Sequence, residues 1–340
     1  MGLTQIGLAA RKRKPASPEA LALIRDASLK APLAPEPFLV RGVEAQVGRN
    51  QRLAAQAFRA ALLRDSRSIP ARYFLSEEYF RSGDVLRGLK EIAILARMVP
   101  NGVDSLGPYV ATYAKNPRTR PQMLALFRSS PQIEQAALTS LSADPASADL
   151  VLGLATPAAN PPQWAARLIE WLVNSGQYGK AHAIWANLSH VAPAPDDLIF
   201  DPRFERPQVQ PPFNWALTSS ALGLAEGQRG GRLHVIYYGQ DNGTLAKQLL
   251  ILGPGRYRLA MRVSGDLTHA RSLAWMVACA GSGNVLLSLP LSAAVPSATF
   301  DVPASCAAQN LALVGNAPEL PQQVDVTISA FSLTRGQSNG

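Results

Sequence analysis

The stretches LIFDPRFERPQVQPPFNWAL, residues 198–217, and KQLLILGPGRYRLAMRV, residues 247–263, decide how this chain folds. Before them the sequence has the periodicity of helices, and after them that of short strands. In the second stretch, residues alternate between two faces on both sides of Gly253-Pro254-Gly255, which predicts a β-hairpin. The second strand of this hairpin has one apolar face and one basic face. The basic face carries Arg256, Arg258 and Arg262.

The length of 340 residues predicts two domains, and 47% hydrophobic with 17% charged residues is typical of a globular protein. The net charge of +9 is unevenly placed, with 23 basic against 14 acidic residues in 1–195 and 10 against 10 in 196–340. Part of this excess is the run Arg11-Lys12-Arg13-Lys14. Membrane proximity through this run is one interpretation, and a solvated terminal tail is the other. We expect no nucleic-acid partner.

The two cysteines, Cys279 and Cys306, both lie in the strand-rich part. One disulfide and an oxidising compartment are one interpretation, and two buried thiols are the other. The sequence has no apolar run of about 18 residues that could span a membrane. Leu3–Ala10 is short and precedes the basic run, which is not the order of a signal peptide. A periplasmic or cell-envelope location therefore requires an export or anchor segment ahead of Met1, and a cytoplasmic location is the alternative.

Residues 1–195 contain a 34-residue repeat, which is seen when the sequence is written in rows of 34 residues so that equivalent positions form columns. The rows lie near 1–34, 35–68 and 69–102, and an out-of-phase row lies near 162–195. The columns hold small, apolar and helix-ending residues: Ala20, Ala54 and Gly88; Ile24, Phe58 and Ile92; Ala27, Ala61 and Leu95; Pro32, Ser66 and Pro100. The fourth row repeats these offsets with Gly176, Tyr178, Ala181, Trp185, Leu188 and Pro193. The spacing predicts stacked helical hairpins, because small residues let two helices approach closely and proline ends the second one.

This small–aromatic–alanine–proline spacing resembles the tetratricopeptide repeat. The resemblance implies an α-helical solenoid that binds a protein partner on its surface. Between Gly102 and Pro161 the register is lost and prolines punctuate short apolar segments, so we expect degenerate repeats there. Trp164 and Trp171 lie seven residues apart on one helix face, where core packing and a partner groove are both open interpretations.

Pro193–Pro195 is the predicted linker to a second domain at 196–340, where short strands alternate with glycine-rich turns. This spacing predicts an antiparallel β-sandwich or jelly roll. The expected strands are 213–218, 232–238, 246–252, 256–263, 272–279, 284–289, 298–302, 309–314 and 323–334.

The second domain resembles the galactose-binding-like jelly rolls, a group that includes carbohydrate-binding modules. The residues that carry the resemblance are Phe204-Glu205, Trp215, Gln248–Leu252, Gly255-Arg256-Tyr257 and Asp325–Leu333. Pro202-Arg203 replaces the Asn-Gly pair expected ahead of Phe204, so we expect no calcium there. The resemblance implies glycan binding, for which flat aromatic rings and polar side chains are needed. The candidates are Trp215, Tyr237, Tyr238, Gln240, Asp241, Arg258, Arg262 and Trp275. Apolar residues flank Trp215 and Trp275, so core burial is the other interpretation of both. Tyr237 and Tyr238 are adjacent, so one of them points outward if they lie on a strand.

Residues suited to catalysis or metal binding are scattered rather than clustered. The four histidines stand singly, and no Cys-x-x-Cys, phosphate-binding loop or GxSxG motif occurs. Asp196-Asp197 and Glu77-Glu78 are adjacent carboxylates, but adjacency alone does not make an acid/base pair. We predict no catalytic residue, no metal site and no cofactor.

The sequence thus predicts a non-catalytic scaffold of the bacterial cell envelope, in which the solenoid binds a protein and the sandwich recognises a glycan during polysaccharide assembly or export. A purely structural scaffold is one alternative, and it predicts that Trp215, Tyr238 and Trp275 are all buried. An enzyme or enzyme subunit acting on polysaccharide is the other alternative.

Overall fold

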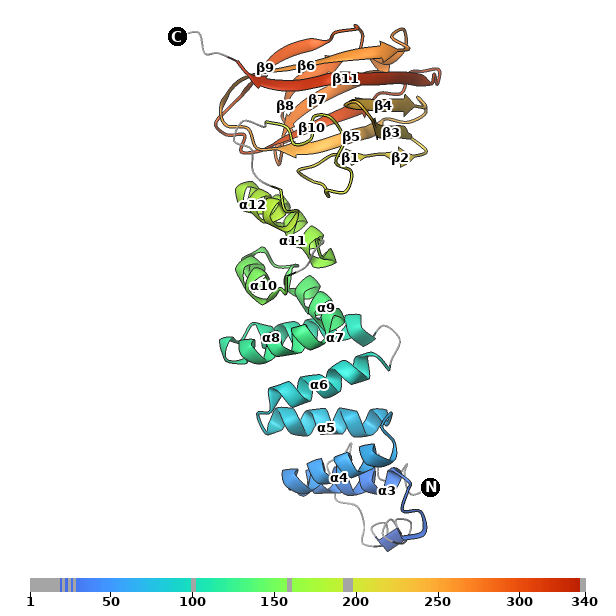
Figure 1. Cartoon of the computed structure of the whole chain (residues 1–340), viewed down its shortest axis with the longest axis vertical. Coiled ribbons are helices and arrows are strands. Elements are labelled where there is room, and N and C mark those ends of the chain that lie inside the picture. The colour runs from blue at the N-terminus through green and yellow to red at the C-terminus, as the bar shows by residue number, and fades with distance from the viewer. Residues whose placement is uncertain are drawn as a thin grey trace. The chain divides into compact units, whose positions relative to one another are not determined.

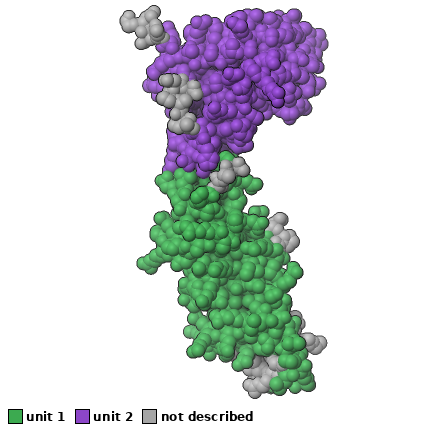
Figure 2. Space-filling model, viewed as in Figure 1, with its two compact units in different colours: residues 1–168 green, residues 169–340 purple. Residues whose placement is uncertain are grey.

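The computed structural model describes residues 19, 22, 23, 26, 29–98, 102–157, 161–191 and 198–336. Over these residues it has the predicted fold class, a run of α-helices followed by an antiparallel β-sandwich (Figure 1). The chain divides into two compact units, residues 1–168 and residues 169–340 (Figure 2). The second unit therefore contains the last two helices of the array, one of them only in part, as well as the sandwich, and the domain boundary expected at residue 195 stays a prediction.

The basic run Arg11–Lys14 and the linker Pro193–Pro195 lie outside the described residues. None of the helices that the structure describes combines the length and apolar character that crossing a membrane requires.

Up to α7 the helices pack mostly against their neighbours in sequence, as expected of a repeat array, whereas α7 packs most extensively against α9. Two short 3₁₀ turns, Pro117–Thr119 and Pro145–Ser147, precede two of them. The helices are α3 Glu36–Val47, α4 Gln51–Arg64, α5 Ile69–Arg81, α6 Val85–Ala96, α7 Gly102–Ala114, α8 Arg120–Ser129, α9 Pro131–Leu141, α10 Ala148–Leu154, α11 Gln163–Asn174 and α12 Tyr178–Leu188.

The turns inside the hairpins recur with the 34-residue spacing. Arg49 between α3 and α4 has a φ of 58°, and Gly83 between α5 and α6 has a φ of 79°. The next residue in each turn, Asn50 or Asp84, donates its backbone N–H to the carbonyl five residues earlier, over 2.8 Å in both cases. The side chains of Asn50 and Asp84 then accept a backbone N–H from the helix that follows. The same short turn, a residue with positive φ followed by Asn or Asp, therefore ends one helix and caps the start of the next.

Close approach of neighbouring helices depends on small residues in the repeat. A Cβ atom at Gly42 would lie 2.3 Å from the Phe58 ring, and one at Gly88 would lie 2.7 Å from the Phe80 ring. The columns predicted to form the core are indeed buried in the second and third rows. Their members are Ala54, Phe58, Ala61, Gly88, Ile92 and Leu95.

The sandwich consists of two antiparallel sheets with strand orders β1-β5-β10-β7-β8 and β2-β3-β4-β11-β6-β9. The five-stranded sheet contains β1 Ala216–Leu217, β5 Gly243–Leu250, β7 Leu273–Cys279, β8 Val285–Pro290 and β10 Gln309–Gly315. The six-stranded sheet contains β2 Ser219–Ser220, β3 Gly223–Gln228, β4 Arg232–Tyr237, β6 Gly255–Gly265, β9 Ser297–Val302 and β11 Val324–Arg335.

Strand β6 has the predicted amphipathic pattern. Its apolar residues Tyr257, Leu259, Met261 and Val263 are buried in the core between the sheets. Its arginines are exposed on the outer face of the six-stranded sheet, where the alternation of strand side chains places them.

The hairpin predicted around Gly253-Pro254-Gly255 is wrong. β5 pairs with β1 and β10, whereas β6 pairs with β9 and β11, so this connection passes from one sheet to the other. Its backbone groups find side-chain partners in place of a paired strand. Gln309 Oε1 accepts the Leu252 N–H at 2.9 Å, and the Tyr257 hydroxyl donates to the Gly253 carbonyl at 2.8 Å. Contacts distant in sequence therefore determine the path of this turn.

Candidate functional sites

Three of the aromatic residues predicted to bind a glycan lie in the core. Trp215 is 7% exposed, and Tyr237 and Trp275 have no exposed surface. The two tryptophan rings lie 5.7 Å apart and both contact Phe331. Because a buried ring has no free face on which a pyranose could stack, the structure corrects the assignment of these three residues to a sugar-binding platform.

The other predicted residues are exposed, in two places. Tyr238, Gln240 and Asp241 lie at the end of β4 and in the loop that follows it, and the Tyr238 side chain is 39% exposed. Arg258 and Arg262 lie on the outer face of the six-stranded sheet. The alternative in which Trp215, Tyr238 and Trp275 are all buried does not match the exposure of Tyr238.

The loop after β4 packs against the loop between β10 and β11. Gly239 lies so close to Gln322 that a Cβ atom there would be 2.4 Å from the Gln322 carbonyl oxygen. Gly239 also has a φ of 70°, which favours glycine. Asn242 Oδ1 accepts the backbone N–H of Ala317 at 2.7 Å. Tyr238, Gln240 and Asp241 therefore belong to the same end of the sandwich as residues 316–322.

A polar pocket of about 290 Å³ lies at this end, and we call it the loop-end pocket. The segment between β6 and β7 is held to the loop after β10 by a 2.8 Å hydrogen bond from the Asn316 N–H to the Ser272 carbonyl. Most of the lining side chains carry hydrogen-bonding groups, which suits a ligand rich in hydroxyls. The lining residues are His269, Arg271, Ser272, Asn316, Pro318 and Gln322.

His269 is held in place by Asp266, with 2.7 Å between its Nδ1 and an Asp266 carboxylate oxygen. The Asp266 carboxylate also accepts the backbone N–H groups of Thr268 and His269. The hydrogen bond with the His269 ring, together with these N–H groups, lowers the pKa of the Asp266 carboxyl. Asp266 thus orders one wall of the loop-end pocket.

A second cavity, of about 660 Å³, lies between α12 and the segment that leads into the sandwich, within the second unit. Its aromatic floor is already used for packing, because Trp185 and Phe213 are each 2% exposed. The Asp201 carboxylate accepts the backbone N–H groups of Glu205 and Arg206, and its carbonyl accepts the Trp215 indole N–H. These groups stabilise the segment and leave the loop-end pocket as the better candidate for ligand binding.

The outer face of the six-stranded sheet holds a histidine between two carboxylates. His234 Nε2 lies 2.9 Å from Asp325 Oδ1, and Nδ1 lies 3.3 Å from Glu226 Oε1. Burial by itself lowers the pKa of His234, but the hydrogen bonds and negative charges of Asp325 and Glu226 outweigh it and raise the pKa overall. The imidazolium is therefore favoured in the folded protein.

We expect the sandwich to lose stability as the pH rises above about 6.5, because the folded state binds the His234 proton more tightly than the unfolded chain does. The contribution is complete below the unfolded-state pKa and is lost as the pH passes through the higher folded-state pKa. The contribution of His234 to the free energy of unfolding is measured by urea unfolding of wild type and His234→Gln at about pH 6 and about pH 8. The same pH-dependent change in both proteins would contradict the prediction.

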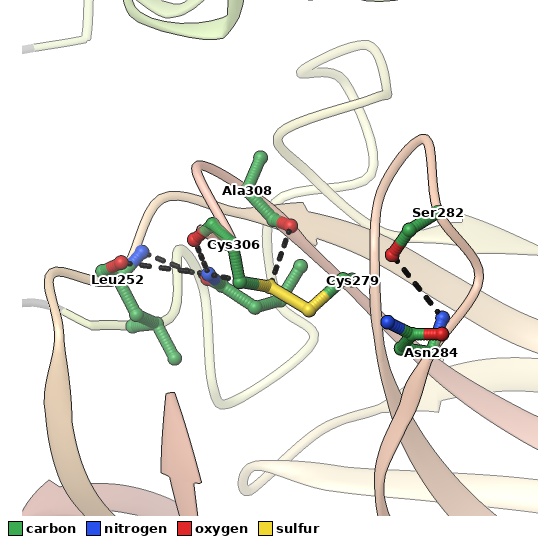
Figure 3. The surroundings of a disulfide bond; sticks show 7 residues. Leu252, Cys279, Ser282, Asn284, Cys306 and Ala308 are labelled. Carbon is green, nitrogen blue, oxygen red and sulfur yellow. Dashed lines mark hydrogen bonds between the residues drawn. A yellow bond between two sulfur atoms is a disulfide. The ribbon is translucent and has the colours of Figure 1, made fainter. Parts of the chain in front are cut away.

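Cys279 and Cys306 form a disulfide that joins the end of β7 to the segment before β10 (Figure 3). Gln309, which is fully buried, donates from Nε2 to the Cys306 carbonyl at 2.9 Å while its Oε1 accepts from Leu252. The disulfide and the connection between the two sheets are thus linked through one glutamine.

The helical unit exposes an aromatic face on α5 and α7. Tyr73 is 51% exposed and Tyr109 is 38% exposed. The Phe80 and Tyr113 rings stack with centroids 5.2 Å apart, and the hydroxyls of Tyr109 and Tyr113 lie 3.2 Å from each other. Burial and the hydrogen bond with Tyr113 raise the pKa of Tyr109. Large rings with polar ends that remain partly exposed are common at protein interfaces.

In the described part of the chain, no group of three or more His, Cys, Asp or Glu side chains is arranged to hold a metal ion. The sequence interpretation missed the loop-end pocket, because its residues come from two loops more than 40 positions apart and no local motif marks either loop.

No protein-family model matches the chain, and no curated protein matches it. A structure titled as accessory secretory protein 1, 2 and 3 of Streptococcus pneumoniae aligns at 11% identity, over 35% of this chain and 90% of that chain, with a TM-score of 0.27. The module TmCBM61 in complex with β-1,4-galactotriose aligns at 16% identity, over 42% of this chain and 100% of that chain, with a TM-score of 0.28. The architecture described above rests on the helices and strand order of this chain.

Proposed function

We propose that this protein is a non-catalytic adaptor whose sandwich recognises a glycan and whose helical unit binds a protein partner. The observation that carries the proposal is the loop-end pocket, in which hydrogen-bonding side chains line a cavity of about 290 Å³ beside the exposed Tyr238 loop. Sugar hydroxyls are bound by such convergent polar groups, and the loop that packs against Gln322 follows the exposed Tyr238.

The aromatic face of α5 and α7 supports the partner-binding role. Tyrosine side chains bury a large area on binding and keep a hydroxyl available for hydrogen bonds, which makes them frequent centres of interface energy. The disulfide supports a location in the periplasm or cell envelope, since disulfides persist in oxidising compartments. Polysaccharide assembly or export would bring a glycan and a protein partner together in that location.

A purely structural scaffold is the second candidate function. The burial of Trp215 and Trp275 favours it, because these rings stabilise the sandwich and offer nothing to a ligand, whereas the exposure of Tyr238 does not. Glycan recognition requires the loop-end pocket to bind a sugar, whereas the structural scaffold does not.

A glycan array probed with the full chain, followed by titration with a neutral oligosaccharide that it retains, tests the proposal. The double variant Arg271→Ala with Asn316→Ala is expected to weaken binding about ten-fold or more, because it removes hydrogen bonds that include one from a charged group. Asn284→Ala is the matched control, because it changes an exposed asparagine in the turn after β7, at the other end of that strand. If the array retains no glycan, or if the double variant and the control bind with equal affinity, glycan recognition by the loop-end pocket is wrong and the structural scaffold becomes the better candidate function.

A further inference from the structure

Three guanidinium groups on the outer face of the six-stranded sheet have no carboxylate partner among the described residues. They belong to Arg232 on β4 and to Arg258 and Arg262 on β6, and we call them the arginine cluster. Arg232 Nε donates to the Arg229 carbonyl at 3.4 Å, and Arg258 Nη2 donates to Ser297 Oγ at 3.2 Å. Both partners are neutral, so these hydrogen bonds leave the positive charges in place.

The carboxylates of the same face are engaged elsewhere. Asp301 on β9 accepts two hydrogen bonds from Arg256, at 3.0 and 3.3 Å. Glu226 and Asp325 are both held by His234, whose charged form they favour. Two carboxylates against one imidazolium leave one negative charge there, so at least two of the three positive charges of the arginine cluster are not neutralised within its own face.

Strand register fixes the spacing of the cluster. Arg232 and Arg262 are the Cα partners of Ser329 on the two sides of β11, so their Cα atoms lie roughly 10 Å apart, two strand separations. Arg258 lies four residues before Arg262 on β6, which is roughly 13 Å along the strand. Anchor points spaced in this way spread three guanidinium groups over the face of the sheet, which suits contact with successive anions of an extended polymer.

We infer that the arginine cluster binds an acidic polysaccharide that carries carboxylates, laid across the outer face of the six-stranded sheet; this rests on the proposed glycan recognition and names its ligand class. A guanidinium group matches a carboxylate with two parallel hydrogen bonds. Ser329 between Arg232 and Arg262, and Thr299 and Thr334 beside Arg258, supply hydroxyls that can bond to those of a sugar.

The composition of this face favours a carboxylated polysaccharide held by ion pairs and hydroxyl hydrogen bonds, without ring stacking, over a single-stranded nucleic acid. The outward positions of β3, β4, β6, β9 and β11 hold no Phe, Tyr or Trp, because the rings of these strands are buried. Single-stranded nucleic acids are held largely by stacking on such rings. Stable attachment to a membrane needs apolar anchors in addition to basic residues.

The test is a calorimetric titration of the full chain with polygalacturonate and with the same polymer after its carboxylates have been reduced to alcohols. We expect the acidic polymer to bind about ten-fold tighter or more, with an affinity that falls as salt is added. The triple variant Arg232→Gln, Arg258→Gln and Arg262→Gln is expected to remove that difference. The double variant Arg256→Gln with Asp301→Asn is the matched control, because it removes an ion pair from the same face without changing the net charge, and its affinity should stay within about two-fold of wild type.

Equal affinity for the acidic and reduced polymers overturns the inference, and so does a folded triple variant with unchanged affinity. Dextran sulfate that binds as tightly as polygalacturonate also overturns it, because the face would then accept any polyanion. If the triple variant has a lowered thermal midpoint, the single variant Arg262→Gln is used in its place, since no hydrogen bond or ion pair joins the Arg262 side chain to another described residue. The neutral oligosaccharide titration with the loop-end pocket variant remains a separate test, so the inference can fail while the proposed function stands.

Discussion

Replacing Cys279 and Cys306 together by alanine is expected to lower the free energy of unfolding of the sandwich by about 3.5 kcal/mol. The two cysteines are 27 positions apart, and their bond restricts a loop of that size in the unfolded chain. Both residues are at most 5% exposed, so the alanines leave small cavities that add to the loss. Denaturant unfolding of wild type and the double variant measures the difference.

Reduced wild type provides the internal control for this prediction. Reductant should lower its stability to nearly that of the double variant and should leave the double variant itself unchanged. Counting thiols with a maleimide tag under denaturing conditions should give no label before reduction and two afterwards. A loss of stability below about 1 kcal/mol would show that the disulfide constrains the chain far less than its loop length implies.

Local patterning was sufficient to locate most strands but not to pair them. Alternation in residues 256–263 correctly separated the buried Tyr257 and Leu259 from the exposed arginines. It could not show that Gly253-Pro254-Gly255 joins two sheets, because the groups that hold this turn include Gln309, which lies 57 positions from Leu252. The local sequence is compatible with a hairpin and with a connection between two sheets, and contacts distant in sequence determine which of the two forms.

Strand β3, Gly223–Gln228, was not expected, because two glycines and an alanine give it low strand propensity. Its residues are required by close packing. A Cβ atom at Gly227 would lie 2.1 Å from the Phe204 carbonyl oxygen, and one at Gly223 would lie 2.2 Å from the Ile236 carbonyl oxygen. Gly223 and Gly227 are thus needed because the backbone of a neighbouring segment lies very close, whereas the sequence alone indicates a turn at such glycines.

The candidate site was predicted in part. The adjacency of Tyr237 and Tyr238 implied that one ring points outward, and Tyr238 is the exposed one. The apolar neighbours of Trp215 and Trp275 indicated burial, and both rings lie in the core. The arginine cluster needed the register of β4, β11 and β6, since Arg232 and Arg262 are 30 positions apart in sequence yet share one cross-strand row.

Trp185→Ala is expected to lower the free energy of unfolding of the second unit by about 3–5 kcal/mol. The side chain is 2% exposed, and its ring lies 5.1 Å from that of Phe200 and 5.5 Å from that of Phe213. Its indole N–H donates to the Gln210 carbonyl at 2.7 Å, so the variant also leaves that carbonyl without its partner. Its place in the 34-residue repeat predicted that Trp185 packs in the solenoid core. In the structure its ring also contacts Phe200 and Phe213, which belong to the segment that leads into the sandwich.

Trp171→Ala is the matched control, because this tryptophan lies on α11 in the same unit and is 42% exposed. Its replacement should change stability by no more than about 0.5–1 kcal/mol. Denaturant unfolding of the full chain, followed by near-ultraviolet circular dichroism of the sandwich aromatics, distinguishes the two variants. If α12 is a structural part of the sandwich unit, the sandwich signal of Trp185→Ala is lost at lower denaturant than that of Trp171→Ala. If both variants unfold the sandwich at the wild-type midpoint, α12 contributes nothing to its stability, and the boundary near residue 195 is the better division of the chain.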